Sequence, residues 1–134
     1  MFVEEIATRL ADAGLGALGT SILIGRNAVL PVDDGGYLVI VDTGGTGADR
    51  TQNGTAVSRP GAQIMACAMD PEAAYALAQG AFAAVGAEVG LHNITLSGVF
   101  YLSLTSRQQP TDTGPDDLGR ARIVFNIDAM KAPS

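Results

Sequence analysis

Two stretches of the chain carry apolar residues at helical spacing. The first places them on one face, at Phe2, Ile6, Leu10 and Ala13. Gly14 follows where a C-terminal cap belongs. The second stretch begins after Asp70, whose carboxylate can accept a free backbone N–H, and Pro71, which has no N–H to leave unpaired. It runs to about Val85, before a glycine. We therefore predict one helix at the N-terminus and one in the middle of the chain.

Shorter runs with the patterns of strands fill much of the remaining chain. They cover residues 21–24, 37–41, 62–69, 94–97, 99–105 and 122–130. The run at 62–69 is apolar on both faces, whereas the last run alternates, with Ile123, Phe125 and Ile127 on one side. An alternating run indicates a strand with one buried face, whereas a run that is apolar on both faces needs cover on both sides.

Two polar stretches separate these elements. Residues 42–59 and 105–119 are rich in Gly, Thr, Asp, Asn and Ser, so we predict two long loops. Within them, residues 43–58 and 106–118 lack apolar anchors. We expect these parts to be mobile in the free subunit and ordered only against neighbours.

The predicted order of elements is α-β-β-β-α-β-β-β. Because the strands come in consecutive runs with the helices set apart, this order favours an α+β fold. We expect a largely antiparallel sheet of about five to six strands with two helices packed on it. The 134 residues suffice for one core, so we predict a single domain over residues 1–134.

The charge balance excludes several classes of partner. Fourteen acidic residues oppose eight Lys and Arg, giving a net charge of −6 and no basic stripe to neutralise phosphates. An anionic membrane surface is disfavoured for the same reason. Glu4 and Glu5 stand where a signal peptide would carry positive charge. The one cysteine, Cys67, cannot form an internal disulfide, which fits a reducing compartment. We expect a soluble protein that is intracellular where it is made.

The segment VIVDTGG at residues 39–45 resembles the way an aspartic protease presents its catalytic carboxylate. A second Asp-Thr-Gly begins at Asp112, but it has no apolar strand before it and a proline directly after it. The chemistry needs two carboxylates in similar environments, close enough to share a proton. The simpler interpretation is that Asp, Thr and Gly form a turn at the end of a buried strand. A homodimer that uses Asp42 twice stays a remote alternative.

No other catalytic, cofactor or metal site is predicted. The segment GGTGADR lacks the third glycine of a phosphate loop and is not followed by a helix. His92 is the only histidine, and Cys67 lies among apolar residues, as a buried structural thiol would. Asp112, Asp116 and Asp117 have no calcium-loop spacing that we can defend.

The chain has more apolar surface than a small sheet and two helices can readily cover. Residues 73–87 carry one polar side chain besides Tyr75, and a helix that is apolar all round must be covered on more than one side. The strand at 62–69 has the same character. Another copy of the chain could provide the cover, with the alanines and Gly80 allowing close approach. Alternatively, alanines tolerate exposure because each contributes little area.

Several motifs, taken together and in order, resemble the minor capsid or tail-terminator (tail completion) family of long-tailed bacteriophages. They are ADAGLGALGTSILIGR at 11–26, VDTGG and ADRT within 41–51, RPGAQIMACA at 59–68, the helix with AAYALA, and LGRARIVFNI at 118–127. The stretch TGADRTQNGTAVS is longer than the family pattern leads us to expect.

This resemblance implies a structural protein of the virion, without catalysis or cofactor, located at the head–tail junction and made in the bacterial host cytoplasm. It implies a homo-oligomer, a hexameric ring, with one face on the tail-tube protein and the other on the head-side connector or stopper protein. DNA would pass through the lumen without specific binding. We expect subunit contacts from charges of opposite sign that flank the two loops, namely Asp49, Arg50, Arg59, Arg107, Asp117 and Arg120. Another head–tail connector or head-completion protein, or a small-ligand sensor, stays open.

Overall fold

The computed structural model describes residues 2–25, 30, 35–44, 46–50, 56–106, 108–116 and 118–131. Within this described part the chain forms two helices and nine strands. In chain order they are α1 (Phe2–Asp12), β1 (Ile22–Ile24), β2 (Tyr37–Asp42), β3 (Thr46–Arg50), β4 (Ala56–Arg59), β5 (Gly61–Ala68), α2 (Pro71–Ala84), β6 (Leu91–Leu96), β7 (Val99–Ser106), β8 (Thr111–Asp112) and β9 (Ala121–Lys131). The predicted α+β class is confirmed.

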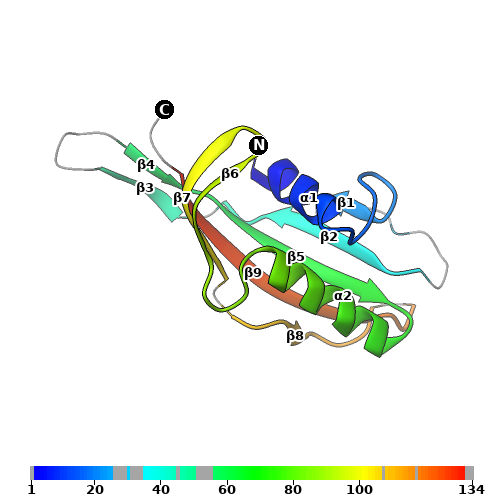
Figure 1. Ribbon diagram of the computed structural model, residues 1–134. Coiled ribbons are helices and arrows are strands. Elements are labelled where there is room, and N and C mark those ends of the chain that lie inside the picture. Colours follow the sequence, from blue (N-terminus) through cyan, green and yellow to red (C-terminus); the bar gives the residue numbers. More distant parts are fainter. Residues whose placement is uncertain are drawn as a thin grey trace.

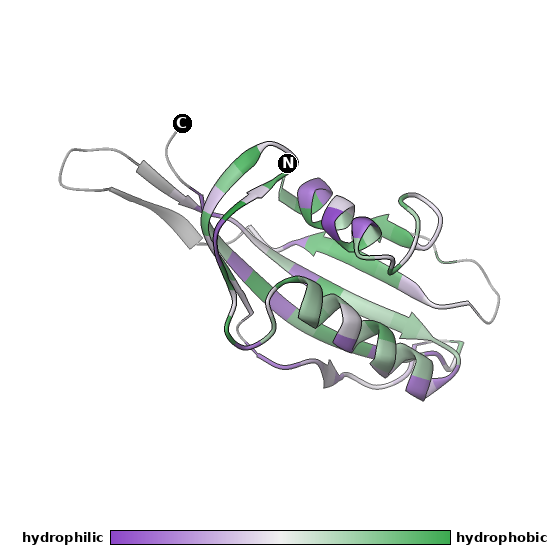
Figure 2. Cartoon of the chain, viewed as in Figure 1, coloured by the Kyte–Doolittle hydropathy of each residue, from purple (hydrophilic) through white to green (hydrophobic). Residues whose placement is uncertain are grey.

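Both helices form where the sequence predicts them. The carboxylate of Asp70 accepts a hydrogen bond from the backbone N–H of Glu72 at 3.1 Å, and Pro71 occupies the first turn of α2. The helix ends before Gly86, which has a φ of 97°, a conformation that favours glycine. In α1 the apolar residues line one side, and hydrophilic residues face away from the sheet (Figure 2). Local capping and periodicity therefore account for both helices.

The sheet is built around β9, its longest strand. On one side β9 pairs antiparallel with β5 from Gly61↔Asp128 to Ala68↔Ala121. On its other side lie β7 and β8, and β6 pairs with β7. Beyond β5, the antiparallel strand β2 is followed by the short parallel strand β1, so the sheet is mostly antiparallel (Figure 1).

Both helices cover the same face of the sheet. The core beneath them takes alternate residues from each central strand, such as Ile64 of β5 opposite Phe125 of β9. Phe82 of α2 packs edge-on against Phe125, with ring centroids 5.5 Å apart. On α1, the buried carboxylate of Glu5 accepts a hydrogen bond from the hydroxyl of Tyr101 at 2.5 Å. This bond fixes the β6–β7 hairpin to α1.

The two predicted loops contain strands that the sequence pattern does not indicate. Within residues 42–59, β3 and β4 form an antiparallel hairpin that projects past the helical layer (Figure 1). Within residues 105–119, β8 pairs with the centre of β9. The prediction that these stretches lack internal structure is therefore wrong for the three strands. Backbone pairing with a partner strand stabilises them, although their polar composition is typical of loops.

Candidate assembly surfaces

The two Asp-Thr-Gly segments both form turns closed by their own aspartates. Asp42 accepts the backbone N–H of Gly44 at 2.7 Å, and Asp112 accepts that of Gly114 at 2.8 Å. Their positions in the sheet also keep them apart. Asp42 of β2 is level with Ile127 of β9, and Asp112 of β8 is paired with Ile123 of β9. The two aspartates are therefore about 13 Å apart along the strand direction and about 14 Å apart across the sheet. Within one subunit the two carboxylates cannot share a proton.

The other candidate chemistry is also dispersed. Cys67 lies opposite Arg122 at one end of β9, and His92 lies across β7 from Met130 at the other, about 26 Å further along the strand direction. Among the residues that the structure describes, no three His, Cys, Asp or Glu side chains are grouped to hold a metal ion. Neither described helix has the length and apolar character needed to cross a membrane.

Residues 113–116 and 118–120, hereafter the 113–120 segment, cover one end of the sheet face that lies opposite the helices. The carboxylate of Asp116 accepts hydrogen bonds from the backbone N–H groups of Leu118 and Arg120, and from the thiol of Cys67 at 3.7 Å. Burial alone would raise the pKa of Asp116, but these backbone bonds and the charge of Arg120 hold that pKa below its usual value. Burial, followed by the charge of Asp116, raises the pKa of the Cys67 thiol. A buried thiol with a raised pKa carries little thiolate and is a weak nucleophile.

Arg120, which the sequence suggests as an interface charge, is only 1% exposed. Its guanidinium lies over the ring of Tyr37, 5.9 Å from the centroid. The expectation that Arg120 is a surface charge is wrong, because the segment around it folds onto the sheet. Reversing its charge would disturb the fold before it disturbed an assembly.

The structure describes the other five interface candidates only in part. Asp49 and Arg50 end β3, where the structure describes the backbone but not the side chains. Arg59 is half-buried at the end of β4. Arg107 and Asp117 lie outside the described residues. The structure therefore does not bring these charges together as one site, and their role in subunit contacts stays a prediction.

The apolar surplus is largely used inside the subunit. Strand β5 is central, with one face under the helices and Cys67, on the other face, covered by the 113–120 segment. Gly80 of α2 faces inward, since a Cβ there would come within 2.7 Å of the side chain of Leu15. The proposed close approach of another copy at Gly80 is therefore wrong. The outer side of α2 instead exposes alanines and Tyr75.

Two small apolar surfaces, which the sequence analysis does not single out, are exposed on other elements. The first, the β1 groove, lies between α1 and β1, is about 300 Å³ in volume, and is bordered by the exposed side chains of Leu18 and Ile24. The second, the β7 patch, consists of Phe100 and Leu102, which are 44% and 36% exposed. Strand alternation could have indicated the β7 patch, because VFYLSLT carries apolar residues on both of its faces.

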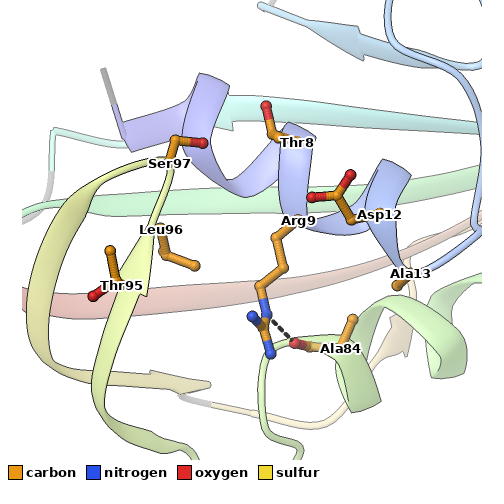
Figure 3. Close-up of a pocket in the computed structure, with 8 residues that line it drawn as sticks. All are labelled: Thr8, Arg9, Asp12, Ala13, Ala84, Thr95, Leu96 and Ser97. Atoms are coloured by element: carbon orange, nitrogen blue, oxygen red, sulfur yellow. Dashed lines mark hydrogen bonds between the residues drawn. The ribbon is translucent and has the colours of Figure 1, made fainter.

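A polar cleft of about 290 Å³ lies between α1, α2 and the β6–β7 turn (Figure 3). Its cation, Arg9, donates a hydrogen bond from Nε to the backbone carbonyl of Ala84 at 2.6 Å. Ala84 ends α2, so the guanidinium complements the negative end of the helix dipole. This hydrogen bond therefore joins the two helices beside the cleft.

Comparison with solved structures shows a similar fold in a virion particle. A chain in the structure described as the virion of a native gene transfer agent (GTA) particle superimposes with a TM-score of 0.59. The match covers 94% of this chain and 90% of that chain, at 17% sequence identity. No family model matches the chain, and no curated protein matches its sequence. At this identity the likeness establishes the fold: the chain has the same α+β architecture as a component of that virion particle.

Proposed function

We propose that the chain is a structural protein of a tailed-phage-like virion, in which it closes the tail tube and joins it to the head connector. The observation that carries the proposal is the shared fold, over nearly the full length of both chains, with a chain of a gene transfer agent virion. The sequence motifs that resemble tail-terminator proteins span the same length. One similarity is of fold and the other of sequence motifs, and both support a virion component.

The physical properties of the subunit are consistent with this role. A helix layer held to one sheet by a single core makes a rigid block. The β1 groove and the β7 patch are small apolar surfaces on different elements, which suits contacts between copies. A net charge of −6 would repel the phosphates of DNA passing through a lumen and so allow it to slide.

The finer features of the proposal come from the family resemblance. We infer six copies per ring, with the tail-tube protein on one face and a head-side connector or stopper protein on the other. The protein would reside in the virion at the head–tail junction after synthesis in the host cytoplasm. Asp49, Arg50 and Arg59 stay candidates for charged contacts between subunits.

The proposal includes no catalysis. Asp42 and Asp112 each close their own turn and are held apart in one subunit. A homodimer using Asp42 twice would be an aspartic protease, so Asp42→Asn tests it directly. We expect this variant to cap tails like the parent chain, and neither protein to cleave peptides. Pepstatin-sensitive cleavage that Asp42→Asn abolishes would contradict the proposal.

The deciding experiment mixes the chain with assembled tail tubes of the same virion. Under the electron microscope, we expect one ring at an end of each tube, and tubes that stop lengthening once the ring is present. Tubes without the chain serve as the control and should keep growing. Tubes that grow equally in both samples and carry no ring would exclude a terminator.

A second candidate is another connector or head-completion protein. The resemblance to components of the head–tail junction favours it over unrelated functions. The two roles predict different partners, because a connector would bind the head-side portal ring in the absence of tail tubes. Co-sedimentation with isolated heads and with isolated tubes, measured in parallel, separates them.

A further inference from the structure

Strand β1 lies at one end of the described sheet, and its pairing with β2 uses the backbone of alternate residues. The N–H of Leu38 donates to the carbonyl of Ser21 at 2.8 Å, and the N–H of Gly25 donates to the carbonyl of Ile40 at 2.9 Å. In this parallel register the N–H and C=O of Leu23 point toward β2. Those of the other two residues of β1, Ile22 and Ile24, point away from it. The outer edge of β1 therefore carries the backbone groups of two residues.

The chain itself pairs with the first of these two residues. The carbonyl of Ala17 accepts the N–H of Ile22 at 3.0 Å, and the N–H of Gly19 donates to the carbonyl of Ile22 at 2.9 Å. These bonds place Leu18 in a parallel bridge beside Ile22. The chain turns back at Gly19, whose φ is 80°, so this pairing stops before Ile24. Within the described part of the chain, no residue bonds to the outward N–H and C=O of Ile24.

The β1 groove begins at the same residue. Ile24 faces the helix side of the sheet, because its partner Ile40 belongs to the core beneath the helices. The side chain of Ile24 is 42% exposed and lines the groove with that of Leu18. In a strand paired beside Ile24, the residue directly opposite would direct its side chain to this same side of the sheet. That side chain would enter the β1 groove, so the outward backbone groups and the groove are aligned for one extended segment.

We propose that the edge of β1 and the β1 groove together bind an extended segment of a partner protein. The segment adds a short strand beside Ile24 and places one aliphatic side chain in the groove. An extended segment has backbone groups available to pair with those of Ile24, whereas a helix pairs its own internally. This site goes beyond the proposed virion role and does not depend on it.

The charge at the β1 groove specifies the partner further. Of the described residues that line the groove, Glu4 alone is charged, and it is exposed. Residues two positions before and after the inserted side chain would face the same side of the sheet, where α1 carries Glu4. The segment should therefore have Lys or Arg at these positions. Such pairs add little affinity, but they select against acidic segments.

The first test uses a synthetic probe, the acetylated and amidated peptide Lys-Thr-Leu-Thr-Lys. Titrated into the isotope-labelled chain, it should give saturable NMR shifts of the amide of Ile24 and of the methyl groups of Leu18 and Ile22. Tyr75, which is exposed on α2, should not shift. The same peptide with Asp in place of both lysines should bind about threefold more weakly or worse, because Glu4 would repel it.

A second pair of peptides tests the strand pairing and leaves the protein unchanged. In an antiparallel pair the N–H of the probe's leucine donates to the carbonyl of Ile24, and in a parallel pair the N–H of the next threonine does so. One of the two peptides N-methylated at these positions should therefore bind at least about fivefold more weakly than the probe. The other, methylated at an N–H that points to solvent, is its matched control.

A pair of protein variants tests the groove. Leu18→Ser removes an apolar side chain from its rim and should weaken binding of the probe at least about fivefold. Leu118→Ser is the matched control, because Leu118 has the same exposed fraction, 49%, and lies outside the groove. It should leave binding within about twofold. Hydrogen exchange of each variant without peptide checks that the sheet is intact.

The opposite results are equally clear. Binding that neither N-methylated peptide weakens would mean that no strand is added at β1, and would overturn the proposal. Shifts that gather elsewhere on the surface, or no binding at millimolar probe, would overturn it as well. Self-association of the chain that the probe displaces would identify a second copy, and not a partner protein, as the occupant. Probe binding is measured on the chain alone, so its outcome is separate from the capping of tail tubes.

Discussion

At the scale of single residues, the pair Tyr101–Glu5 is the most informative polar contact in the core. Both side chains are buried, and the hydroxyl donates to the carboxylate at 2.5 Å across 96 positions of sequence. A buried carboxylate needs hydrogen-bond donors, because desolvating it without them is costly. The pair therefore ties the β6–β7 hairpin to α1, and with it the position of the β7 patch.

Tyr101→Phe should lower the free energy of unfolding by about 1–3 kcal/mol, since it removes a donor from a buried charged acceptor. Urea denaturation measures the change. Tyr75→Phe, which removes a hydroxyl from a tyrosine exposed on α2, is the control and should change little. If the two substitutions changed the free energy of unfolding equally, the buried hydrogen bond would make no net contribution to stability.

The Tyr101–Glu5 pair makes the free energy of unfolding depend on pH in the alkaline range. Burial, and then the hydrogen bond and charge of Glu5, raise the pKa of Tyr101 well above its ordinary value near 10. The unfolded chain therefore releases this proton at a lower pH than the folded chain. Its stabilising effect is complete below about pH 10 and is lost as the pH rises further. Unfolding free energies measured from pH 8 to 11 should fall less steeply for Tyr101→Phe than for the parent chain.

At the scale of elements, the turn between α2 and β6 and the turn between β6 and β7 each contain a glycine with a positive φ. Gly86 has a φ of 97°, and a Cβ there would lie 2.5 Å from the backbone carbon of Gly90. Gly98, in the β6–β7 turn, has a φ of 83° with open space around it. Both positions favour glycine by conformation, but only the first also forbids a side chain sterically.

Gly86→Ala should therefore destabilise the fold by more than about 3 kcal/mol, and Gly98→Ala by only about 1–2 kcal/mol, the cost of the left-handed conformation. Thermal or urea unfolding of the two variants gives the comparison. Similar losses at the two positions would mean that the backbone around Gly86 can move aside, contrary to the tight contact.

The 113–120 segment is a second element whose stability can be tested alone. Its central acceptor is Asp116, which holds the N–H groups of Leu118 and Arg120 and covers Cys67. Asp116→Asn removes the charge beneath these bonds, so the segment should open more often. The rate at which a thiol reagent labels Cys67 reports that opening. We expect faster labelling in the variant, with the global unfolding transition changed much less.

Acid, like the Asp116→Asn substitution, should make the 113–120 segment open more often. The pKa of Asp116 is held low in the folded state, so its contribution is complete above the ordinary carboxyl pKa and declines as the pH falls through the folded value. Hydrogen exchange of the backbone N–H groups of Leu118 and Arg120 should therefore lose protection in acid in the parent chain. Asp116→Asn should show weak protection at every pH.

The elements also show what the sequence can predict and what it cannot. Helix α2 and strand β9 were predictable, because a local cap and a period of two residues specify them. Strands β3, β4 and β8 were not predictable. They are held by backbone hydrogen bonds, β3 to β4 and β8 to β9, and their polar residues show no periodic pattern in the sequence. Arg120 was misplaced for a related reason. Only the folded path of residues 113–116 and 118–120 reveals that its guanidinium lies against Tyr37.

At the scale of the whole molecule, the dominant property is negative charge. Fourteen acidic side chains against eight basic ones leave a net charge of −6 on a small chain, and the proposed ring would multiply it. Affinity for DNA comes mainly from neutralising phosphates, which a net negative charge disfavours. A protein that surrounds moving DNA benefits from a surface that does not attract phosphates, because each attractive contact would have to break whenever the DNA moves.

The chain should therefore not retard duplex DNA in a gel, even at about 50 mM salt, where electrostatic binding is strongest. The same holds for the assembled ring, which should be assayed on capped tail tubes as well as in free solution. Retention by the parent chain that weakens steeply with added salt would place basic side chains toward the DNA. It would then favour a connector that grips DNA over a ring through which DNA slides.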